Sequence, residues 1–119
     1  MHAASHWKVW LDAHTPEAGR RVTKRIAEKL GLELVNFSIE PYPKGGFVAA
    51  WTCLHDVPDR NAAIVTVIGH GQKLAKGWSL GGSVYDELEG LVSKAGHHHI
   101  SIAGVTMLTW RVSVTTPDT

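Results

Sequence analysis

The stretch DVPDRNAAIVTVIGHGQKLAKG, residues 56–77, decides the fold because it carries two conflicting patterns. Its run AAIVTVI is rich in β-branched residues, which favour a strand. Apolar or small residues also recur there at helical spacing, at Ile64, Val67, Ile68, Gly71, Leu74 and Ala75. Asp59 or Asn61 can cap such a helix and Gly77 can end it, although the internal Gly69 and Gly71 disfavour it. We therefore predict a helix over 56–77.

The neighbouring segments follow the same two periods. Alternation of apolar and polar residues predicts strands at 6–12, 32–40, 47–54, 78–82 and 105–114. Residues 14–31 predict a helix, with Thr15 as its cap, Pro16 in the first turn and Gly31 at its end. Residues 83–96 predict a third, short helix that begins at Ser83 and ends at Gly96.

These elements predict one α+β domain over residues 1–119, with flexible ends at 1–5 and 115–119. The first six elements, β-α-β-β-α-β, match a ferredoxin-like split βαβ unit, to which the short helix and a C-terminal strand are added. We expect an antiparallel sheet with helices on one face. We expect four residues to be buried against the first helix: Val9, Phe37, Trp78 and Trp110.

Composition excludes some classes of protein. The net charge is +1, from 12 basic and 11 acidic residues, so bulk charge favours no particular partner. Cys53 is the single cysteine, which allows no intramolecular disulfide, and the first residues lack the pattern of a signal peptide. The longest apolar run, AAIVTVIG, is far shorter than the ~20 residues of a membrane span. We expect a cytoplasmic protein that does not bind membranes.

Three consecutive histidines lie in KAGHHHISIAG, residues 94–104, between the predicted short helix and the last strand. In an extended segment His97 and His99 point the same way, so a metal would need a further ligand from His55, from the adjacent Asp56 or from His70. No metal-binding motif surrounds them, and we predict an exposed loop without a specific metal or cofactor. Elemental analysis of tag-free protein tests this expectation.

Catalytic motifs are equally absent. GGSVY is not a nucleophile elbow, because Tyr85 stands where a glycine is needed. IGHGQKL is not a dinucleotide-binding motif, because Leu74 replaces its third glycine. Cys53 lies within a predicted strand, where a small buried residue is expected. We predict no catalytic residue.

Two features point to a macromolecular partner. The first helix carries a basic stripe, which we define as Arg20, Arg21, Lys24 and Arg25. Its alternative interpretation is an ordinary solvated helix face. Trp10 alternates away from Trp7, Val9 and Leu11, which predicts a tryptophan on the open face of the sheet. Tryptophan and arginine dominate protein interfaces, so we take the basic stripe and Trp10 as candidate partner-binding residues.

The segments GWSLGGSVYDELEGLVSKAG and IAGVTMLTWRVSV, within residues 77–114, resemble the carboxyl ends of small immunity proteins of bacterial polymorphic toxin systems. The resemblance implies a small α/β protein that binds and neutralises a toxin. Immunity proteins that block nucleases tend to be acidic, and the basic first helix departs from that pattern. A different kind of toxin, or no toxin, would then be needed.

These observations suggest three possible functions, which we give in order of preference. The first is a non-enzymatic protein of immunity or inhibitor type that acts by binding a partner protein. The second is a small metal-dependent or histidine-based enzyme using His97, His99 and His55. The third is a nucleic-acid-binding module.

Overall fold

The computed structural model describes residues 2–83, 87–94 and 99–115. Its elements, in chain order, are β1 (His2–Leu11), α1 (Pro16–Leu30), β2 (Val35–Pro41), β3 (Phe47–Asp56), α2 (Arg60–Leu74), β4 (Ala75–Lys76), β5 (Ser79–Gly82), β6 (Leu88–Ser93), β7 (His99–Ile100) and β8 (Val105–Thr115). Among the described residues, no helix is both long enough and apolar enough to cross a membrane.

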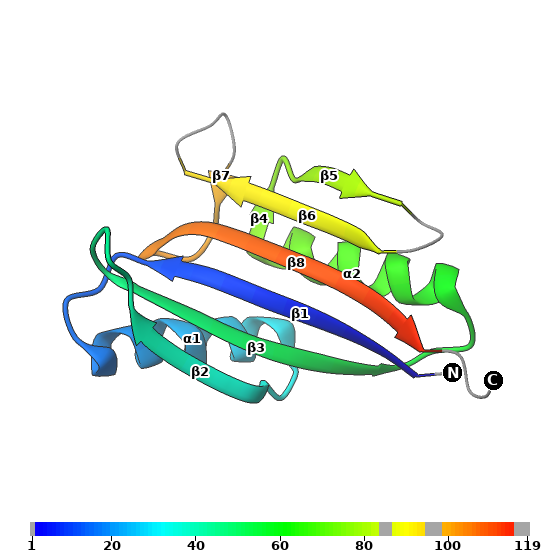
Figure 1. Cartoon of the computed structure of the whole chain (residues 1–119), viewed down its shortest axis with the longest axis horizontal. Helices are drawn as coiled ribbons and strands as arrows, with labels where there is room; N and C mark the ends of the chain where they lie inside the picture. The colour runs from blue at the N-terminus through cyan, green and yellow to red at the C-terminus, as the bar shows by residue number, and fades with distance from the viewer. Residues whose placement is uncertain (1, 84–86, 95–98, 116–119) are drawn as a thin grey trace.

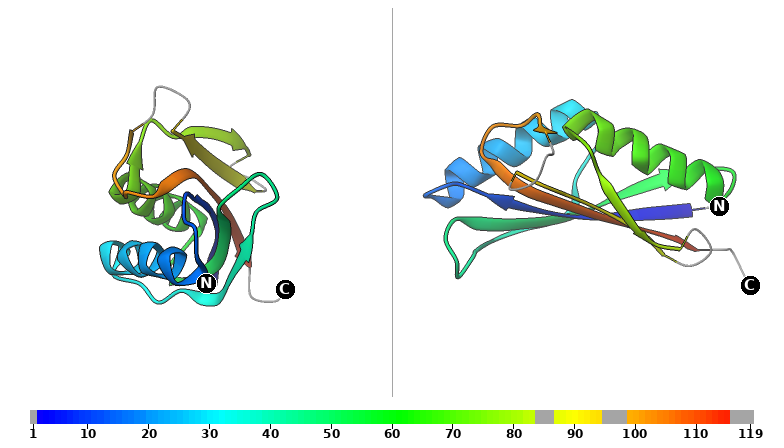
Figure 2. Two further views of the ribbon diagram at one scale, coloured as in Figure 1. Left: turned by 90° about the vertical axis from the view of Figure 1, so that its left-hand side faces the viewer. Right: turned by 90° about the horizontal axis from the view of Figure 1, so that it is seen from above.

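The strands form a six-stranded sheet in the order β2-β3-β1-β8-β6-β5, in which every neighbouring pair is antiparallel. A small second sheet pairs β4 with β7. Both helices lie on one face of the large sheet and leave its other face uncovered (Figures 1 and 2). The prediction of an α+β domain with an antiparallel sheet and helices on one face is confirmed.

The ambiguous stretch is helical, as predicted. Asp59 caps α2, because its Oδ1 accepts a hydrogen bond of 2.8 Å from the Ala62 amide. Val67 and Leu74 are fully buried on the sheet side, so packing and the cap outweigh the strand propensity of the β-branched run. The predicted end was wrong: α2 stops before Ala75, which enters β4, and not at Gly77.

The first helix also has its predicted ends. The Thr15 hydroxyl accepts a hydrogen bond of 3.1 Å from the Ala18 amide, and Pro16 is the first helical residue. Gly31 adopts the left-handed conformation with φ 68°, and its amide bonds to the Ala27 carbonyl. Both ends therefore follow from residues within the helix or next to it.

The predicted helix over 83–96 is wrong for its described part, because Leu88–Ser93 is strand β6. Leu88, Gly90 and Val92 are buried, while Glu89 and Leu91 are exposed, which is the period of a strand. The apolar residues there satisfy both periods, and pairing with β8 decides between them. Residues 84–86 lie outside the described part of the chain.

The sheet order corrects two further predictions. The 78–82 segment does form a strand, β5, but it lies at the edge of the sheet, and β8 occupies the position beside β1. Residues 2–5, expected to be flexible, belong to β1, where they pair with both β3 and β8. Backbone pairing on both sides holds this end of the chain in place.

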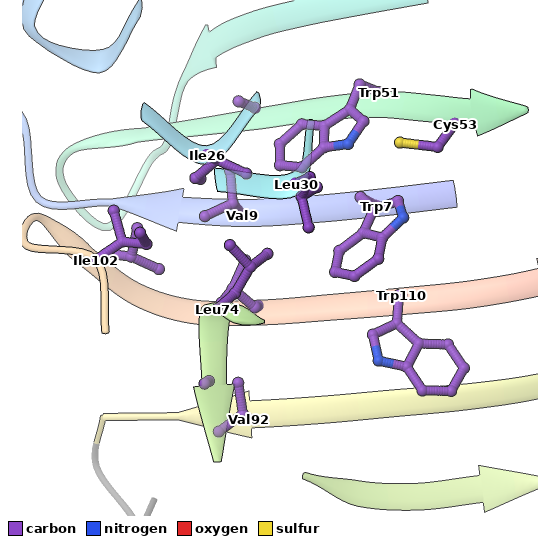
Figure 3. Close-up of a cluster of buried hydrophobic side chains, with 14 of the residues drawn as sticks. Trp7, Val9, Ile26, Leu30, Trp51, Cys53, Leu74, Val92, Ile102 and Trp110 are labelled. Atoms are coloured by element: carbon purple, nitrogen blue, oxygen red, sulfur yellow. The ribbon is translucent and has the colours of Figure 1, made fainter. Parts of the chain in front are cut away.

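Three buried tryptophans and a half-buried one lie in a row on the helix side of the sheet, and we call them the tryptophan row: Trp51, Trp7, Trp110 and the half-buried Trp78. Trp7 stacks on Trp51, with ring centroids 6.2 Å apart and planes 4° apart, and meets Trp78 edge-on at 6.3 Å. Trp78 contacts Trp110 at 6.1 Å, and its indole N–H donates to the Gly71 carbonyl at 2.9 Å. Figure 3 shows Trp51, Trp7 and Trp110 side by side on β3, β1 and β8.

The predicted burial of four residues against the first helix is confirmed only in part. Val9 and Trp110 are buried, as predicted, but Trp110 packs near Gly71 of α2 rather than against α1. Trp78 is half-buried. Phe37 is 36% exposed, so its predicted burial is wrong. The cause is an irregularity in β2 between Val35 and Ser38, where Asn36 has a φ of 54° and interrupts the alternation.

The packing of the tryptophan row requires a glycine at position 90. A β-carbon at this position would lie 2.6 Å from Trp110 Nε1, and the indole has little room to move inside the core. Gly90→Ala should therefore lower the free energy of unfolding by about 1–3 kcal/mol, measured by urea denaturation. Gly81→Ala on the neighbouring strand is the matched control, because its β-carbon would meet no described atom within 4 Å. Equal effects of the two substitutions would contradict the packing argument.

Candidate functional site: the open face of the sheet

The uncovered face of the sheet is built by alternate residues of its central strands. His6, Lys8 and Trp10 of β1 point away from the helices, because Trp7, Val9 and Leu11 point into the core. The antiparallel register places Thr52 and Arg111 on either side of His6, so residues from β3, β1 and β8 share this face. We call this surface the open face.

The open face contains a hollow of about 720 Å³. Its lining includes side chains or backbone from six strands, among them His6, Lys8, Trp10, Thr52, Leu91, Thr109 and Arg111. A second hollow of about 570 Å³ lies at one end, between the β1–α1 connection and the β2–β3 hairpin, and Trp10 lines both. The face is therefore concave and mixes polar with apolar groups, as small binding surfaces do.

Trp10 is held between two neighbours. Its ring meets Tyr42 edge-on, with centroids 6.5 Å apart, and Lys8 Nζ lies 5.9 Å from the ring centroid. The side chain is half-buried, so one side remains available to a partner. The predicted placement of Trp10 away from the core agrees with this geometry.

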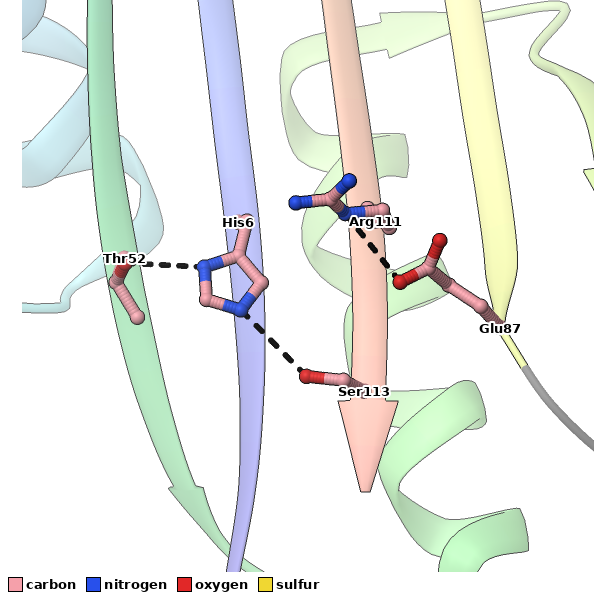
Figure 4. Close-up of polar contacts among 5 residues, drawn as sticks. All are labelled: His6, Thr52, Glu87, Arg111 and Ser113. Atoms are coloured by element: carbon pink, nitrogen blue, oxygen red, sulfur yellow. Dashed lines mark hydrogen bonds and ion pairs between the residues drawn. The ribbon is translucent and has the colours of Figure 1, made fainter. Parts of the chain in front are cut away.

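His6 links three strands on the same face (Figure 4). Its Nδ1 lies 3.2 Å from Thr52 Oγ1, and its Nε2 lies 3.5 Å from Ser113 Oγ. Each hydroxyl can donate or accept, so either neutral tautomer of the imidazole is accommodated. Nearby, Arg111 Nε lies 3.5 Å from Glu87 Oε2 in a solvent-exposed ion pair, which constrains both side chains only weakly.

The basic stripe lies elsewhere. Arg20, Arg21, Lys24 and Arg25 are exposed on α1, and none of them forms an ion pair with another described residue. Since α1 covers the opposite face of the sheet, the structure does not bring the stripe together with Trp10 (Figure 2). The candidate partner-binding residues therefore form two separate surfaces.

The candidate metal ligands are also separated. His55 is buried beneath α2, whereas His99 is exposed in β7. His97 and His98 lie outside the described residues. Within the described ranges, no three histidine, cysteine, aspartate or glutamate side chains gather closely enough to hold a metal ion.

A buried polar cluster, which the sequence analysis did not identify, lies on the helix side. The Trp7 indole N–H donates to Ser5 Oγ at 2.8 Å, and Ser5 Oγ lies 2.8 Å from His55 Nε2. The His55 ring is 5.5 Å from that of His70 in α2. Ser5 is fully buried, so this serine–histidine contact offers a substrate no access. We call these four residues the buried histidine cluster.

Burial sets the ionisation of this region. It lowers the pKa of His55, with a smaller contribution from the neighbouring His70. It also lowers the pKa of His70, with a smaller contribution from Lys73. Burial raises the pKa of the Cys53 thiol, whose side chain is 1% exposed. Cys53 is thus a buried, protonated residue, as its position in a strand predicted.

The chain matches no protein-family model, and no curated protein or solved structure shows significant similarity to it.

The buried histidine cluster makes stability depend on pH. Because both pKa values are lowered in the folded state, the unfolded chain binds more protons once the pH falls below the ordinary histidine value of about 6.5. The free energy of unfolding should be constant above this pH and should decrease as the pH falls through it. Urea denaturation between pH 8 and pH 5 measures the effect.

His70→Gln removes one titrating group and should flatten this decrease. His14→Gln is the matched control, because His14 is exposed before α1. An unchanged pH dependence in the His70 variant would contradict the assignment.

Proposed function

We propose that the protein is a non-enzymatic binding protein of immunity or inhibitor type, which neutralises a partner protein through direct contact with the open face. The observation that carries the proposal is the concave hollow around Trp10, Lys8 and Arg111, which neither helix covers. An apolar sheet face is normally covered by another layer of the same protein. The open face mixes polar with apolar groups, so it can be exposed to water in the free protein and still form a reversible contact with a partner.

The chemistry of the open face suits a protein interface. Trp10 supplies a large, partly fixed aromatic surface, and Arg111, half exposed beside His6, lines the same hollow. These residue types contribute most of the binding energy in protein interfaces. Lys8, His6 and Thr52 add hydrogen-bonding groups whose positions are set by the rigid strands.

Two alternative functions have weaker support. An enzyme using His55 with His99 needs the two side chains to converge, yet one is buried and the other exposed. A nucleic-acid module needs an excess of positive charge, yet Glu87 and Glu89 accompany Arg111 and Lys8 on the open face. The basic stripe on α1 is the surface that a nucleic acid would favour.

We also propose that the core is the ferredoxin-like split βαβ unit. The order β2-β3-β1-β8, with β3 inserted between β1 and β2, supports it. In this arrangement β4–β7 are an insertion between α2 and β8, and β5 and β6 build one wall of the hollow. An experimental structure with β8 away from β1 would contradict this assignment.

The proposal includes a cytoplasmic site of action, the compartment expected from the single cysteine. Cell fractionation tests it. The resemblance to immunity proteins directs the search for the partner to proteins encoded next to this chain, which are to be purified and tested individually.

Trp10→Ala should weaken binding of that partner at least tenfold, about 1.4 kcal/mol, mainly through faster dissociation. The truncation removes the aromatic surface and leaves the strand intact. Surface-based binding kinetics measure the effect. Val65→Ala is the matched control, because Val65 is 69% exposed on α2, on the opposite face. Equal affinities for the wild type and the Trp10 variant would refute the open face as the binding site.

Reversing Arg21 and Arg25 to glutamate should slow association, most strongly at low ionic strength, because charges outside the contact steer encounter. The double variant Lys76→Glu, Lys94→Glu changes the net charge equally at two other exposed positions and is the control. Association rates measured at several salt concentrations decide the matter. If the Arg21 and Arg25 reversal behaves like the control at every concentration, the basic stripe is only a solvated helix face.

A further inference from the structure

The two edges of the sheet differ in how well they are protected. The β2 edge is interrupted between Val35 and Ser38, where Asn36 has a positive φ, and it ends in Pro41. Such devices prevent another strand from pairing. The β5 edge, Ser79–Gly82, is exposed at all four residues and contains no charge and no proline. Only the β5 edge is therefore open to a further strand within the described sheet.

The register shows which backbone groups of β5 face outward. The Ser83 amide donates to the Glu87 carbonyl at 2.9 Å, next to the pair Gly82–Leu88. In an antiparallel ladder, inward and outward residues alternate. Leu80 and Gly82 consequently direct their N–H and C=O groups away from β6. No described strand pairs with this outer side (Figure 1).

The glycines keep this edge accessible. Gly82 has a φ of 87°, and a β-carbon there would collide with the Glu87 carbonyl, so the turn requires a glycine. Gly81 has no such constraint, since its β-carbon would meet no described atom within 4 Å. A glycine that the fold does not need leaves space for another backbone to approach closely.

Apolar side chains flank the edge on both faces of the sheet. Leu91 lies opposite Ser79 and is 42% exposed, while Leu80 lies opposite Gly90 and is 53% exposed. Successive residues point to opposite faces, so an added strand would find one leucine on each side. Ser79, Leu80 and Gly81 also line the hollow of the open face, which makes the edge continuous with the proposed binding surface.

We infer that β5 is a strand-addition site, at which an extended apolar segment of the partner protein pairs with the outward groups of Leu80 and Gly82. The inference rests on the proposed function, because the same partner occupies the adjoining hollow. Main-chain hydrogen bonds hold such a segment, and its alternate side chains contact Leu91 and the hollow. A second copy of this chain offers only four residues in a symmetric β5–β5 pairing, which favours the partner segment.

The test uses linear 12-residue peptides selected from a displayed library against the full chain. Bound peptides should slow amide hydrogen exchange at Leu80 and Gly82, measured by NMR. Leu80→Pro removes an outward donor without removing a bond to β6, and it should weaken peptide binding at least tenfold. Leu80→Ala keeps the donor and should retain affinity within about threefold.

A second pair of variants guards against misfolding of the proline variant. Gly81→Lys adds a long charged side chain at the edge where no described atom is displaced, and it should also weaken binding, by more than Gly81→Ala, which adds a single methyl group. Peptides that leave the exchange of Leu80 and Gly82 unchanged, or bind both Leu80→Pro and Gly81→Lys as tightly as the wild type, would overturn the inference. Slow exchange at these amides in a dimer of the free chain would also overturn it, because a second copy then covers the edge.

The two proposals fail separately. If Trp10→Ala weakens binding of the partner protein but no peptide pairs with β5, the open face remains the binding site and the strand-addition site is refuted. If peptides pair with β5 and no partner protein depends on Trp10, the strand-addition site stands and the open face is refuted as the docking surface.

Discussion

The stacking of Trp7 between Trp51 and the edge-on Trp78 is the contact on which the rest of the structure depends. It joins the central strand β1 to β3 and to the segment after α2. Trp78 bonds to the Gly71 carbonyl, and a β-carbon at Gly71 would lie 3.2 Å from the indole nitrogens of both Trp78 and Trp110. α2 therefore approaches the sheet closely at Gly71, and a larger residue there would push the helix away. The tryptophan row thus sets the distance between the two layers.

The same row makes the two faces of the sheet different in composition. Large aromatic residues fill the helix side, so the alternation of β1 leaves Lys8 and Trp10 on the other side without a covering layer. Ser5 and His55 on the helix side are buried in contact with each other, so a partner cannot reach their polar groups. We therefore assign the proposed partner to the open face and the β5 edge.

Burial also explains why the described histidines His6, His55 and His70 do not form one cluster. His55 and His70 are held near each other in a desolvated environment that disfavours their charged forms. Both ring nitrogens of His6 contact hydroxyl groups on the open face. Each of these histidines therefore has a structural environment of its own, and they do not converge on one point.

The sequence by itself determined the features that depend on near neighbours: the caps at Thr15 and Asp59, the end of α1 at Gly31, and the side of β1 to which Trp10 points. Only the tertiary structure decided which segments pair. Leu88–Ser93 became a strand because β8 pairs with it, although its apolar spacing suits a helix equally well. The contacts of His6 with Thr52 and Ser113 join residues 46 and 107 positions apart, and strand register alone brings them together. Local periodicity contains no information about register, so the composition of the candidate site could not be read from it.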